Sequence, residues 1–450
     1  MSFSSFDLHP SLLRAAADAG FTEPTPIQRD AIPHCLAGRD VVACAMTGSG
    51  KTAAFLLPIM NRLLAVPRGR TRALVLAPTR ELAAQIVEHF GALARHTELR
   101  AAAVFGGVPA APQERALRRG VDLVVACPGR LLDHLQHPYA RLAGLEVLVL
   151  DEADRMLDMG FLPDIKRVLA ALPKAEQTLL FSATIPPPIV HLARQLMRDP
   201  AVLDVERPPA PASGVRQQIY PVPERLKPQL LLALLRGDTL ANALVFTRTK
   251  HRANRLAAFL QQHAIECERI HGNRSQGQRT LALDGFKSGR YRVLVATDVA
   301  ARGIDIAALS HVVNFDVPNV PEDYIHRVGR TARAGATGEA LTFAAPQERA
   351  ELSAIERAVG KTLPRATLPG FDYDQAPAGR FEIPIGERIA EIRARKAEDR
   401  ARARAKAERK AVAAERLSGA AVAVTAPVPA RAGLERPRRP RRGRRSGRRY

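Results

Sequence analysis

Short apolar runs rich in Val and Leu alternate with longer helical patterns along most of this chain, and the alternation occurs twice. Strands that are apolar on both faces and separated by helices indicate a parallel sheet covered by helices on both sides. The chain is therefore predicted to be an α/β protein with two parallel sheets in tandem. The strands predicted for the first sheet are 41–45, 73–77, 121–126, 147–150 and 178–181. Those predicted for the second sheet are 243–246, 267–270, 292–296, 311–315 and 340–343.

A proline-rich stretch separates the two sets of strands. Residues 207–214 read R-P-P-A-P-A-S-G, and their three prolines remove backbone donors and fix φ, so neither sheet can continue through them. We interpret this stretch as a linker between a first domain, 1–206, and a second domain, 215–372. Beyond 372 the strand signals stop, and residues 373–450 are expected to form a basic, largely disordered tail. Within it, 387–416 has helical propensity without an apolar stripe, and 436–450 is too rich in charge, Pro and Gly for a packed core.

The charge of the chain is strongly positive. Its 450 residues include 67 Lys and Arg against 45 Asp and Glu, a formal net charge of +22, which predicts a polyanionic partner and nucleic acid first. From residue 431 onward ten arginines face one glutamate. Such a segment is expected to bind phosphates without reading sequence, although a merely solubilising tail stays open as the alternative.

The cysteines and the apolar runs exclude several other classes of protein. Cys35, Cys44, Cys127 and Cys267 are scattered singly, without the spacing of a zinc site or a disulfide framework. The N-terminus lacks a basic region followed by an apolar core, and no apolar run reaches the length of a membrane span. We therefore expect a soluble, cytoplasmic protein with no membrane partner.

A phosphate-binding loop follows the first predicted strand. Residues 45–52 read A-M-T-G-S-G-K-T and open the helical pattern at 53–64. Small residues let backbone N–H groups point at a triphosphate at the helix N-terminus, where the helix dipole also favours anions. Lys51 is expected to meet the β and γ phosphates of ATP, and Thr52 to offer a hydroxyl ligand to Mg²⁺. The loop residues expected to line this site are Thr47, Gly48, Ser49 and Gly50.

Two carboxylates follow the predicted strand 147–150. Residues 151–154 read D-E-A-D, and a carboxylate at the carboxyl end of a buried parallel strand lies where such sheets bind ligands. Asp151 can hold the magnesium while Glu152 polarises an attacking water. Alone, the tetrapeptide could also be a helix cap or a solvated corner. Together with Lys51 it predicts nucleotide hydrolysis.

These two motifs, followed by S-A-T at 182–184, resemble the DEAD-box RNA helicases of helicase superfamily two. Further pieces match in order: G-F-T-E-P-T-P-I-Q at 20–28, P-T-R-E-L at 78–82, G-G at 106–107, C-P-G-R at 127–130 and H-R-V-G-R-T-A-R-A-G at 326–335. The resemblance covers 3–372, and L-P-G-F-D at 368–372 leans toward the bacterial RhlE-like branch. It implies two RecA-like domains and an RNA-dependent ATPase that separates or remodels short RNA duplexes and ribonucleoproteins locally.

The resemblance also implies roles for individual residues. Gln28 and an upstream aromatic, Phe3 rather than Phe6, are expected to read the adenine within the segment 1–28. The residues expected to act in catalysis are Lys51, Asp151, Glu152 and the arginine fingers Arg330 and Arg333. Gly303 and Asp305 are expected to approach the ATP. Those expected along the RNA are the P-T-R-E stretch with Pro78, Thr79 and Arg80, then Gly106, Gly107, Pro128, Gly129, Arg130, Arg248, Asn273, Gln276, Arg279 and Thr297. Those expected to couple the domains are Asp154, Ser182, Thr184 and His326.

The division of these residues between the two domains implies that the complete ATP site exists only when the domains close. RNA crossing both domains favours the same state, so RNA and ATP are expected to strengthen each other's binding. A DNA helicase or translocase, and a non-catalytic RNA-annealing protein, stay open as alternatives. The expected partner is single-stranded or short duplex RNA, bound by a monomeric core. Ribosome assembly, mRNA decay and cold-stress remodelling all stay open as settings.

Overall fold

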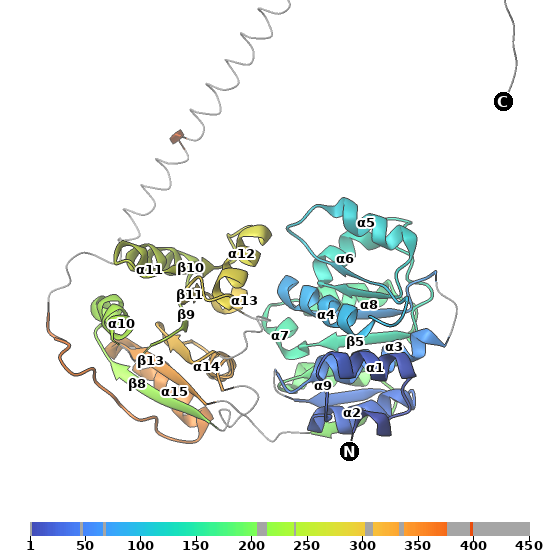
Figure 1. Ribbon diagram of the computed structural model, residues 1–450, viewed down its shortest axis with the longest axis horizontal. Coiled ribbons are helices and arrows are strands. Elements are labelled where there is room, and N and C mark those ends of the chain that lie inside the picture. The colour runs from blue at the N-terminus through green and yellow to red at the C-terminus, as the bar shows by residue number, and fades with distance from the viewer. Residues whose placement is uncertain are drawn as a thin grey trace, which may run out of the picture. The chain divides into compact units, whose positions relative to one another are not determined.

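The computed structural model describes residues 2–45, 48–65, 69–204, 214–237, 240–301, 309–332, 337–375 and 397–398 (Figure 1). Residues Met1–Phe381 form one compact unit, and Glu382–Tyr450 form a second unit in which two residues are described. The predicted linker, apart from Gly214, and most of the predicted tail therefore lie outside the described residues.

The first sheet has seven strands in the described part of the chain, all paired in parallel in the order β3-β4-β2-β5-β6-β1-β7. Successive strand residues point to opposite faces, so Val41 and Ala43 join one apolar cluster while Val42 joins the other. Helices cover both clusters, as expected for a buried parallel sheet. The strands are β1 (Val41–Cys44), β2 (Ala73–Leu76), β3 (Ala101–Val104), β4 (Leu123–Ala126), β5 (Val147–Asp151), β6 (Gln177–Ser182) and β7 (Ala201–Asp204).

The second sheet repeats this architecture with six described strands in the parallel order β10-β11-β9-β12-β13-β8. Ala243 and Val245 pack into one apolar cluster, and Leu244 and Phe246 pack into another on the opposite face. The strands are β8 (Val215–Pro221), β9 (Ala243–Phe246), β10 (Cys267–Ile270), β11 (Val293–Ala296), β12 (His311–Asn314) and β13 (Gly338–Ala344).

Short helices connect the strands of both sheets (Figure 1). No helix in the described ranges combines the length and the apolar character needed to cross a bilayer. The helices of the first sheet are α1 (Pro10–Asp18), α2 (Pro26–Leu36), α3 (Lys51–Leu64), α4 (Arg80–Leu93), α5 (Ala110–Arg119), α6 (Pro128–Leu135), α7 (Ala153–Asp158), α8 (Leu162–Ala170) and α9 (Pro187–Leu196). Those of the second are α10 (Lys227–Arg236), α11 (Lys250–Gln262), α12 (Gln276–Lys287), α13 (Asp298–Ala301), α14 (Pro321–Val328) and α15 (Arg349–Val359).

The predicted fold class, two tandem parallel sheets, is confirmed, and all ten predicted strands are present within one or two residues of their predicted ends. Three further strands, β3, β7 and β8, were not predicted. All three lie at sheet edges, where a strand is less buried and loses the continuous Val- and Leu-rich signal. β3 reads A-A-A-V, which has low strand propensity, and β8 reads V-R-Q-Q-I-Y-P, with three consecutive polar residues.

The carboxyl ends of parallel strands meet at one edge of a sheet. In the first sheet β1, β6 and β5 are neighbours, so the loop after β1, the end of β5 and the end of β6 lie side by side. These three places carry the phosphate-binding loop, Asp151 and Ser182. The fold therefore gathers the predicted phosphate chemistry at this edge.

Candidate active site

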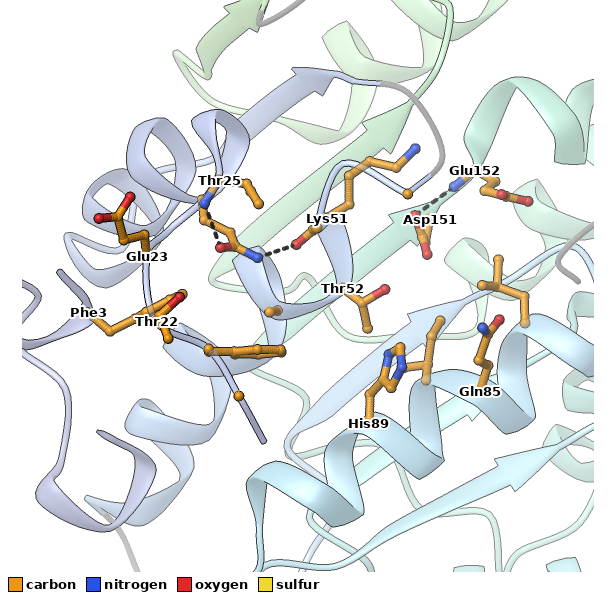
Figure 2. Close-up of a pocket in the computed structure, with 18 of the residues that line it drawn as sticks. Phe3, Thr22, Glu23, Thr25, Lys51, Thr52, Gln85, His89, Asp151 and Glu152 are labelled. Carbon is orange, nitrogen blue, oxygen red and sulfur yellow. Dashed lines mark hydrogen bonds between the residues drawn. The ribbon is translucent and has the colours of Figure 1, made fainter. Parts of the chain in front are cut away.

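A pocket of about 370 Å³ opens at the carboxyl edge of the first sheet, where the loop after β1 faces the end of β5 (Figure 2). Lys51 begins α3, is 6% exposed, and donates a hydrogen bond of 2.9 Å from Nζ to the carbonyl of Ala45. The loop therefore folds back over its own lysine. The predicted site residues that line the pocket are Phe3, Gln28, Gly48, Gly50, Lys51, Thr52, Asp151, Glu152 and Arg330. Ser49 belongs to the same loop, and Thr47 lies outside the described residues.

Gly50 permits a close approach between the phosphate-binding loop and α2. Its φ of 96° lies in the left-handed region, and a Cβ there would lie 2.5 Å from Gln28 Nε2. Gln28 Nε2 donates to the Gly50 carbonyl at 3.0 Å, and Gln28 Oε1 accepts from the Thr25 backbone N–H at 2.9 Å. Gln28 thus fixes the beginning of α2 to the loop that follows β1.

Asp151 and Glu152 lie side by side at the end of β5 and are both buried. Asp151 Oδ1 accepts a hydrogen bond of 3.0 Å from the Glu152 backbone N–H. Glu152 has a φ of 51°, a left-handed conformation that costs free energy in a residue with a side chain. Burial raises the pKa of the Asp151 carboxyl to about 7, against the opposing effect of the Lys51 charge.

Glu152 is held by an arginine that the sequence did not single out. Arg155 Nη1 donates to Glu152 Oε2 at 2.9 Å, and both side chains are buried. Burial alone would raise the pKa of Glu152, but the charges of Arg155, Lys51 and Arg330 outweigh it and lower the pKa to about 2. The carboxylate is therefore ionised at neutral pH. The i, i+3 spacing of Glu152 and Arg155 on either side of a helix start was the signal available in the sequence.

Asp154 joins the D-E-A-D segment to the S-A-T segment. Its Oδ2 accepts hydrogen bonds from the Thr184 backbone N–H at 2.9 Å and from the Thr184 hydroxyl at 3.0 Å. The Asp154 backbone N–H donates to Ser182 Oγ at 3.0 Å. His326 lines a small cleft with Arg155, and burial together with the Arg155 charge lowers the pKa of His326 to about 4. The structure thus brings Asp154, Ser182 and Thr184 into direct contact and places His326 beside them.

Two aromatic rings lie at the end of the pocket away from Asp151. Phe3 lines the pocket and stacks on Phe21, with ring centroids 5.9 Å apart and an interplanar angle of 25°. Phe6 packs edge-on against Phe3 inside the apolar core. Phe21 also lines the pocket and is 36% exposed. The prediction did not name it, although an exposed aromatic directly before Thr22-Glu23-Pro24 is the kind of ring that binds a planar ligand.

Replacing Phe21 with Ala is expected to raise the KM for ATP about tenfold, because one stacked ring contributes roughly 1 to 1.5 kcal/mol. Steady-state ATPase assays at varied ATP concentration measure this. Phe21→Tyr keeps the ring and serves as the control, with an unchanged KM. Equal KM values for the Ala and Tyr variants would show that the ring does not contact the nucleotide.

The residues predicted along RNA in the first domain form one group at the ends of β2, β3 and β4. Arg80 passes so close to Gly107, whose φ is 80°, that a Cβ at Gly107 would overlap the guanidinium. Arg130 Nη1 donates to the Val108 carbonyl at 3.4 Å, and both arginines lie near Gly106. The flanking positions cap helices: Thr79, after Pro78, accepts from the Leu82 backbone N–H, while Pro128 and Gly129 begin α6.

Glu81 makes a contact that its predicted place along the RNA backbone did not include. Its carboxylate lies 2.9 Å from Arg279 Nη2 and accepts a hydrogen bond of 3.0 Å from Gln276 Nε2. Gln276 and Arg279 were themselves predicted to bind RNA. The acid of the P-T-R-E stretch therefore neutralises part of the basic surface beside it.

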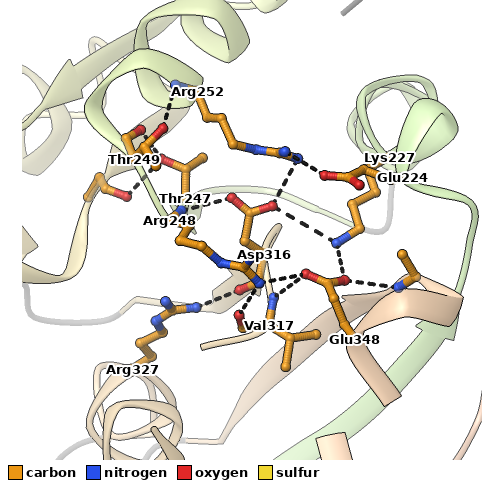
Figure 3. A network of polar contacts seen from close by, with 12 residues as sticks. Glu224, Lys227, Thr247, Arg248, Thr249, Arg252, Asp316, Val317, Arg327 and Glu348 are labelled. Atoms are coloured by element: carbon orange, nitrogen blue, oxygen red, sulfur yellow. Dashed lines mark hydrogen bonds and ion pairs between the residues drawn. The ribbon is translucent and has the colours of Figure 1, made fainter. Parts of the chain in front are cut away.

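The remaining predicted residues of the second domain lie at the carboxyl ends of β9, β10 and β11. Arg248 follows β9 and donates from Nη2 to Glu348 Oε1 and to the Val317 carbonyl, both at 3.1 Å (Figure 3). Asn273 Oδ1 accepts from Lys250 Nζ at 3.2 Å. Thr297 is half-buried directly after β11. Gly303, Asp305 and Arg333 lie outside the described residues.

Comparison with known proteins agrees with this architecture. The family model DEAD/DEAH box helicase matches residues 25–192, and the helicase conserved C-terminal domain matches 226–335. The DEAD-box ATP-dependent RNA helicase CshA of Bacillus cereus is 42% identical over 371 residues, 82% of this chain and 70% of that protein. CshA of Bacillus subtilis is 42% identical over 390 residues, 86% of this chain and 78% of that protein. S. cerevisiae Dbp5 bound to RNA and ADP BeF3 superposes with a TM-score of 0.75 and 32% identity, covering 81% of this chain and 95% of Dbp5.

The chain therefore belongs to the DEAD/DEAH box helicase family, which confirms the resemblance found in its motifs. The finer assignment to an RhlE-like branch is not supported, because these relatives carry the name CshA. That assignment depended on five residues, L-P-G-F-D, at the end of the second domain. A motif this short is a weaker guide than identity across the whole core.

Proposed function

We propose that this protein is an ATP-dependent RNA helicase that couples RNA binding and ATP hydrolysis to local, non-processive unwinding or remodelling of RNA duplexes and ribonucleoproteins. The observation that carries the proposal is the pocket at the edge of the first sheet. It brings Lys51, Asp151 and Glu152 together (Figure 2), and Gln28, Phe3 and Phe21 also line it. This lining suits a nucleoside triphosphate, with phosphates at the charged end beside Lys51 and a base beside the aromatic rings.

At the charged end, the loop residues Thr47, Gly48, Ser49 and Gly50 surround the phosphates, and Lys51 leaves the Ala45 carbonyl to bind the β and γ phosphates. Glu152 positions and polarises a water molecule for attack on the γ-phosphorus. The bond from that phosphorus to the bridging oxygen of ADP breaks as the water oxygen bonds. At the other end, Phe3 supports Phe21 against the adenine, and Gln28 reads the edge of the base.

Magnesium fits the donors of this site. Asp151 offers a carboxylate and Thr52 a hydroxyl, the hard oxygen ligands that Mg²⁺ prefers. The raised pKa of Asp151 indicates a buried negative charge that Lys51 alone does not offset. The described residues contain no cluster of three or more His, Cys, Asp or Glu that could hold a metal, so phosphate oxygens and water would complete the coordination. When bound, the ion neutralises charge on the phosphates.

The second domain, 215–372, supplies the arginine fingers Arg330 and Arg333 to the γ-phosphate, while Gly303 and Asp305 approach the nucleotide and Asp305 binds its ribose. Arg330 already lines the pocket. Closure of this domain on the first domain, 1–206, about the linker 207–214 completes the site. Asp154, Ser182, Thr184 and His326 transmit that closure between the domains.

RNA is proposed to run along the carboxyl edges of both sheets. The groups at Arg80, Gly107 and Arg130, and at Arg248 and Thr297, offer guanidinium groups and closely approachable backbone to phosphates. Gln276 and Arg279 release the Glu81 carboxylate and bind RNA instead. Asn273 binds RNA beside them. We place the protein in the cytoplasm with a monomeric core, acting on ribosomal or mRNA-decay assemblies.

The proposal is tested by measuring the ATPase rate of the full chain with and without single-stranded RNA, and with single-stranded DNA of the same sequence. We expect strong stimulation by RNA and weak stimulation by DNA. Equal stimulation by both would favour a DNA helicase or translocase. No stimulation by either, together with strand annealing, would favour the RNA-annealing alternative.

Removing the tail, 373–450, is expected to weaken RNA binding at least about tenfold and to flatten its dependence on salt, because fewer phosphate counterions are then released. The kcat at saturating RNA should not change, since the proposed catalytic residues lie before 373. RNA affinity measured at two salt concentrations, for the full chain and the truncated chain, checks this. Identical affinities and salt slopes would mean that the tail does not tether RNA.

A further inference from the structure

Arg327, in the last turn of α14, has almost all of its hydrogen-bonding capacity used inside the second domain. Its Nε and Nη2 donate to the two carboxylate oxygens of Asp298 at 2.6 and 2.8 Å. Its Nη1 donates to Asn314 Oδ1 at 3.1 Å and to the Asp316 carbonyl at 2.7 Å. The side chain is 2% exposed, and its guanidinium lies over the Phe246 ring, 5.0 Å from the centroid. Four of its N–H groups are thus occupied, so Arg327 cannot serve as a third phosphate-reaching arginine.

The partners of Arg327 belong to the loops proposed to meet RNA. Asp298 is the residue after Thr297. Asp316 accepts from the Arg248 backbone N–H at 2.8 Å through Oδ2, and the next carbonyl, Val317, accepts from the Arg248 guanidinium (Figure 3). Two of the proposed RNA-facing positions of the second domain, Thr297 and Arg248, are therefore connected to one buried guanidinium.

Arg327 also lies one helical turn before the proposed arginine finger. The Arg330 backbone N–H donates to the Arg327 carbonyl at 3.0 Å, and Arg330 lines the ATP pocket. A displacement of the loops at Thr297 or Arg248 must therefore move Arg327 or break its hydrogen bonds. Because the bidentate pair with Asp298 is stiff, moving Arg327 moves the backbone from which Arg330 extends.

We infer that Arg327, together with Asp298, is a positioning pair that transmits RNA contact at Thr297 and Arg248 to the arginine finger Arg330, and so sets the ATPase rate of the RNA-bound enzyme. This inference rests on the proposed function. Neither residue is proposed to contact ATP or RNA. The pair acts through the loops and the helix that it joins.

Asp298→Asn and Arg327→Lys test the inference in the full chain. Asn keeps the size of Asp but loses its charge. Lys keeps the charge of Arg but cannot donate hydrogen bonds to Asp298, Asn314 and Asp316 at the same time. Both variants should lower kcat at saturating RNA about tenfold, while the KM for ATP and the half-saturating RNA concentration change less than about twofold. Asp298→Glu restores a carboxylate and should recover part of the lost kcat.

A closely matched ion pair in the first domain supplies the control. Arg72 is also 2% exposed, donates to both oxygens of Glu146 at 2.6 and 2.9 Å, and donates to the Leu63 carbonyl. Arg72 directly precedes β2 and Glu146 directly precedes β5, so the pair lies at the amino edge of the first sheet, away from the pocket. Glu146→Gln should shift the thermal midpoint as much as Asp298→Asn without the loss of kcat. If Asp298→Asn unfolds at too low a temperature for the ATPase assay, the kcat of Arg327→Lys tests the inference instead.

The inference is overturned if kcat at saturating RNA is retained in both variants, or if Glu146→Gln loses as much. Failure of the proposed function gives a different result, since the unmodified chain would then lack RNA-stimulated ATPase. If RNA stimulates the ATPase of the unmodified chain and the variants keep the same kcat, the inference fails but the proposed function stands.

Discussion

Glu152→Gln should reduce the RNA-stimulated ATPase rate by about 100-fold or more, because a positioned general base contributes roughly 10² to 10⁴ in rate. The amide cannot accept a proton from the attacking water, although it keeps the size of the carboxylate. Its oxygen can still accept the hydrogen bond from Arg155 that Glu152 accepts at 2.9 Å. ATP affinity should therefore change little. Single-turnover hydrolysis and equilibrium binding of ATP, measured on the same sample, separate the two effects.

Glu146→Gln is the matched control for this prediction as well. Glu146 precedes the same strand, β5, and is likewise paired with a buried arginine, Arg72, but at the opposite end of the strand from the pocket. This variant should keep most of its ATPase activity. A similar loss in both variants would indicate that disturbing β5, rather than removing a base, lowers the rate.

Nine of the ten strands that the sequence predicted lie inside their sheets, and the tenth, β10, lies at an edge. The residues of the inner strands, such as Val41 with Val42 or Leu244 with Val245, enter apolar clusters on opposite sides, so every position must be apolar and the run is conspicuous. The edge strands β3, β7 and β8 have a neighbouring strand on one side alone, so their residues need not all be apolar. Their sequences are therefore harder to distinguish from the flanking loops. All three missed strands lie at sheet edges, although the fourth edge strand, β10, was predicted.

The candidate site was predictable where its residues directly follow strands. The sequence could place Lys51 beside Asp151 and Glu152, because the carboxyl ends of parallel strands all lie at one edge of the sheet. Phe21 was missed because the Phe3 ring on which it stacks lies 18 positions earlier in the chain, and Arg155 was missed although its i, i+3 spacing from Glu152 was a signal in the sequence. Local motifs thus predict phosphate chemistry better than they predict the residues that support it.

The charge network of Lys227, Asp316 and Glu348 in the second domain could not be predicted at all, because it joins residues far apart in the chain. Lys227 at the start of α10 meets Glu348, 121 positions later, and Asp316 lies nearby. Each residue alone reads as an ordinary surface charge, since Lys, Asp and Glu are rarely fully buried unless paired. Only the packed structure shows that these charges lie inside the domain that carries Arg248 and Arg327.

Lys227→Met should destabilise the second domain by about 3 kcal/mol or more, since removing one partner of a buried ion pair leaves the other charge uncompensated. Lys227 is fully buried, and its Nζ donates to Glu348 Oε2 at 2.6 Å and lies 4.0 Å from Asp316 Oδ1 (Figure 3). Glu348 keeps hydrogen bonds from Arg248 and two backbone N–H groups, which places the loss at the lower end of the usual range. Urea unfolding measures it.

Tyrosine emission can follow this unfolding in the second domain. The chain has no tryptophan, and four of its six tyrosines, at 220, 291, 324 and 373, lie in or beside the second sheet. Lys361→Met, at an exposed lysine after α15, should change stability by less than about 0.5 kcal/mol. Adding Glu348→Gln to Lys227→Met should restore part of the loss by removing the unpaired charge. If Lys227→Met unfolds like Lys361→Met, the ion pair of Lys227 with Glu348 does not stabilise the domain.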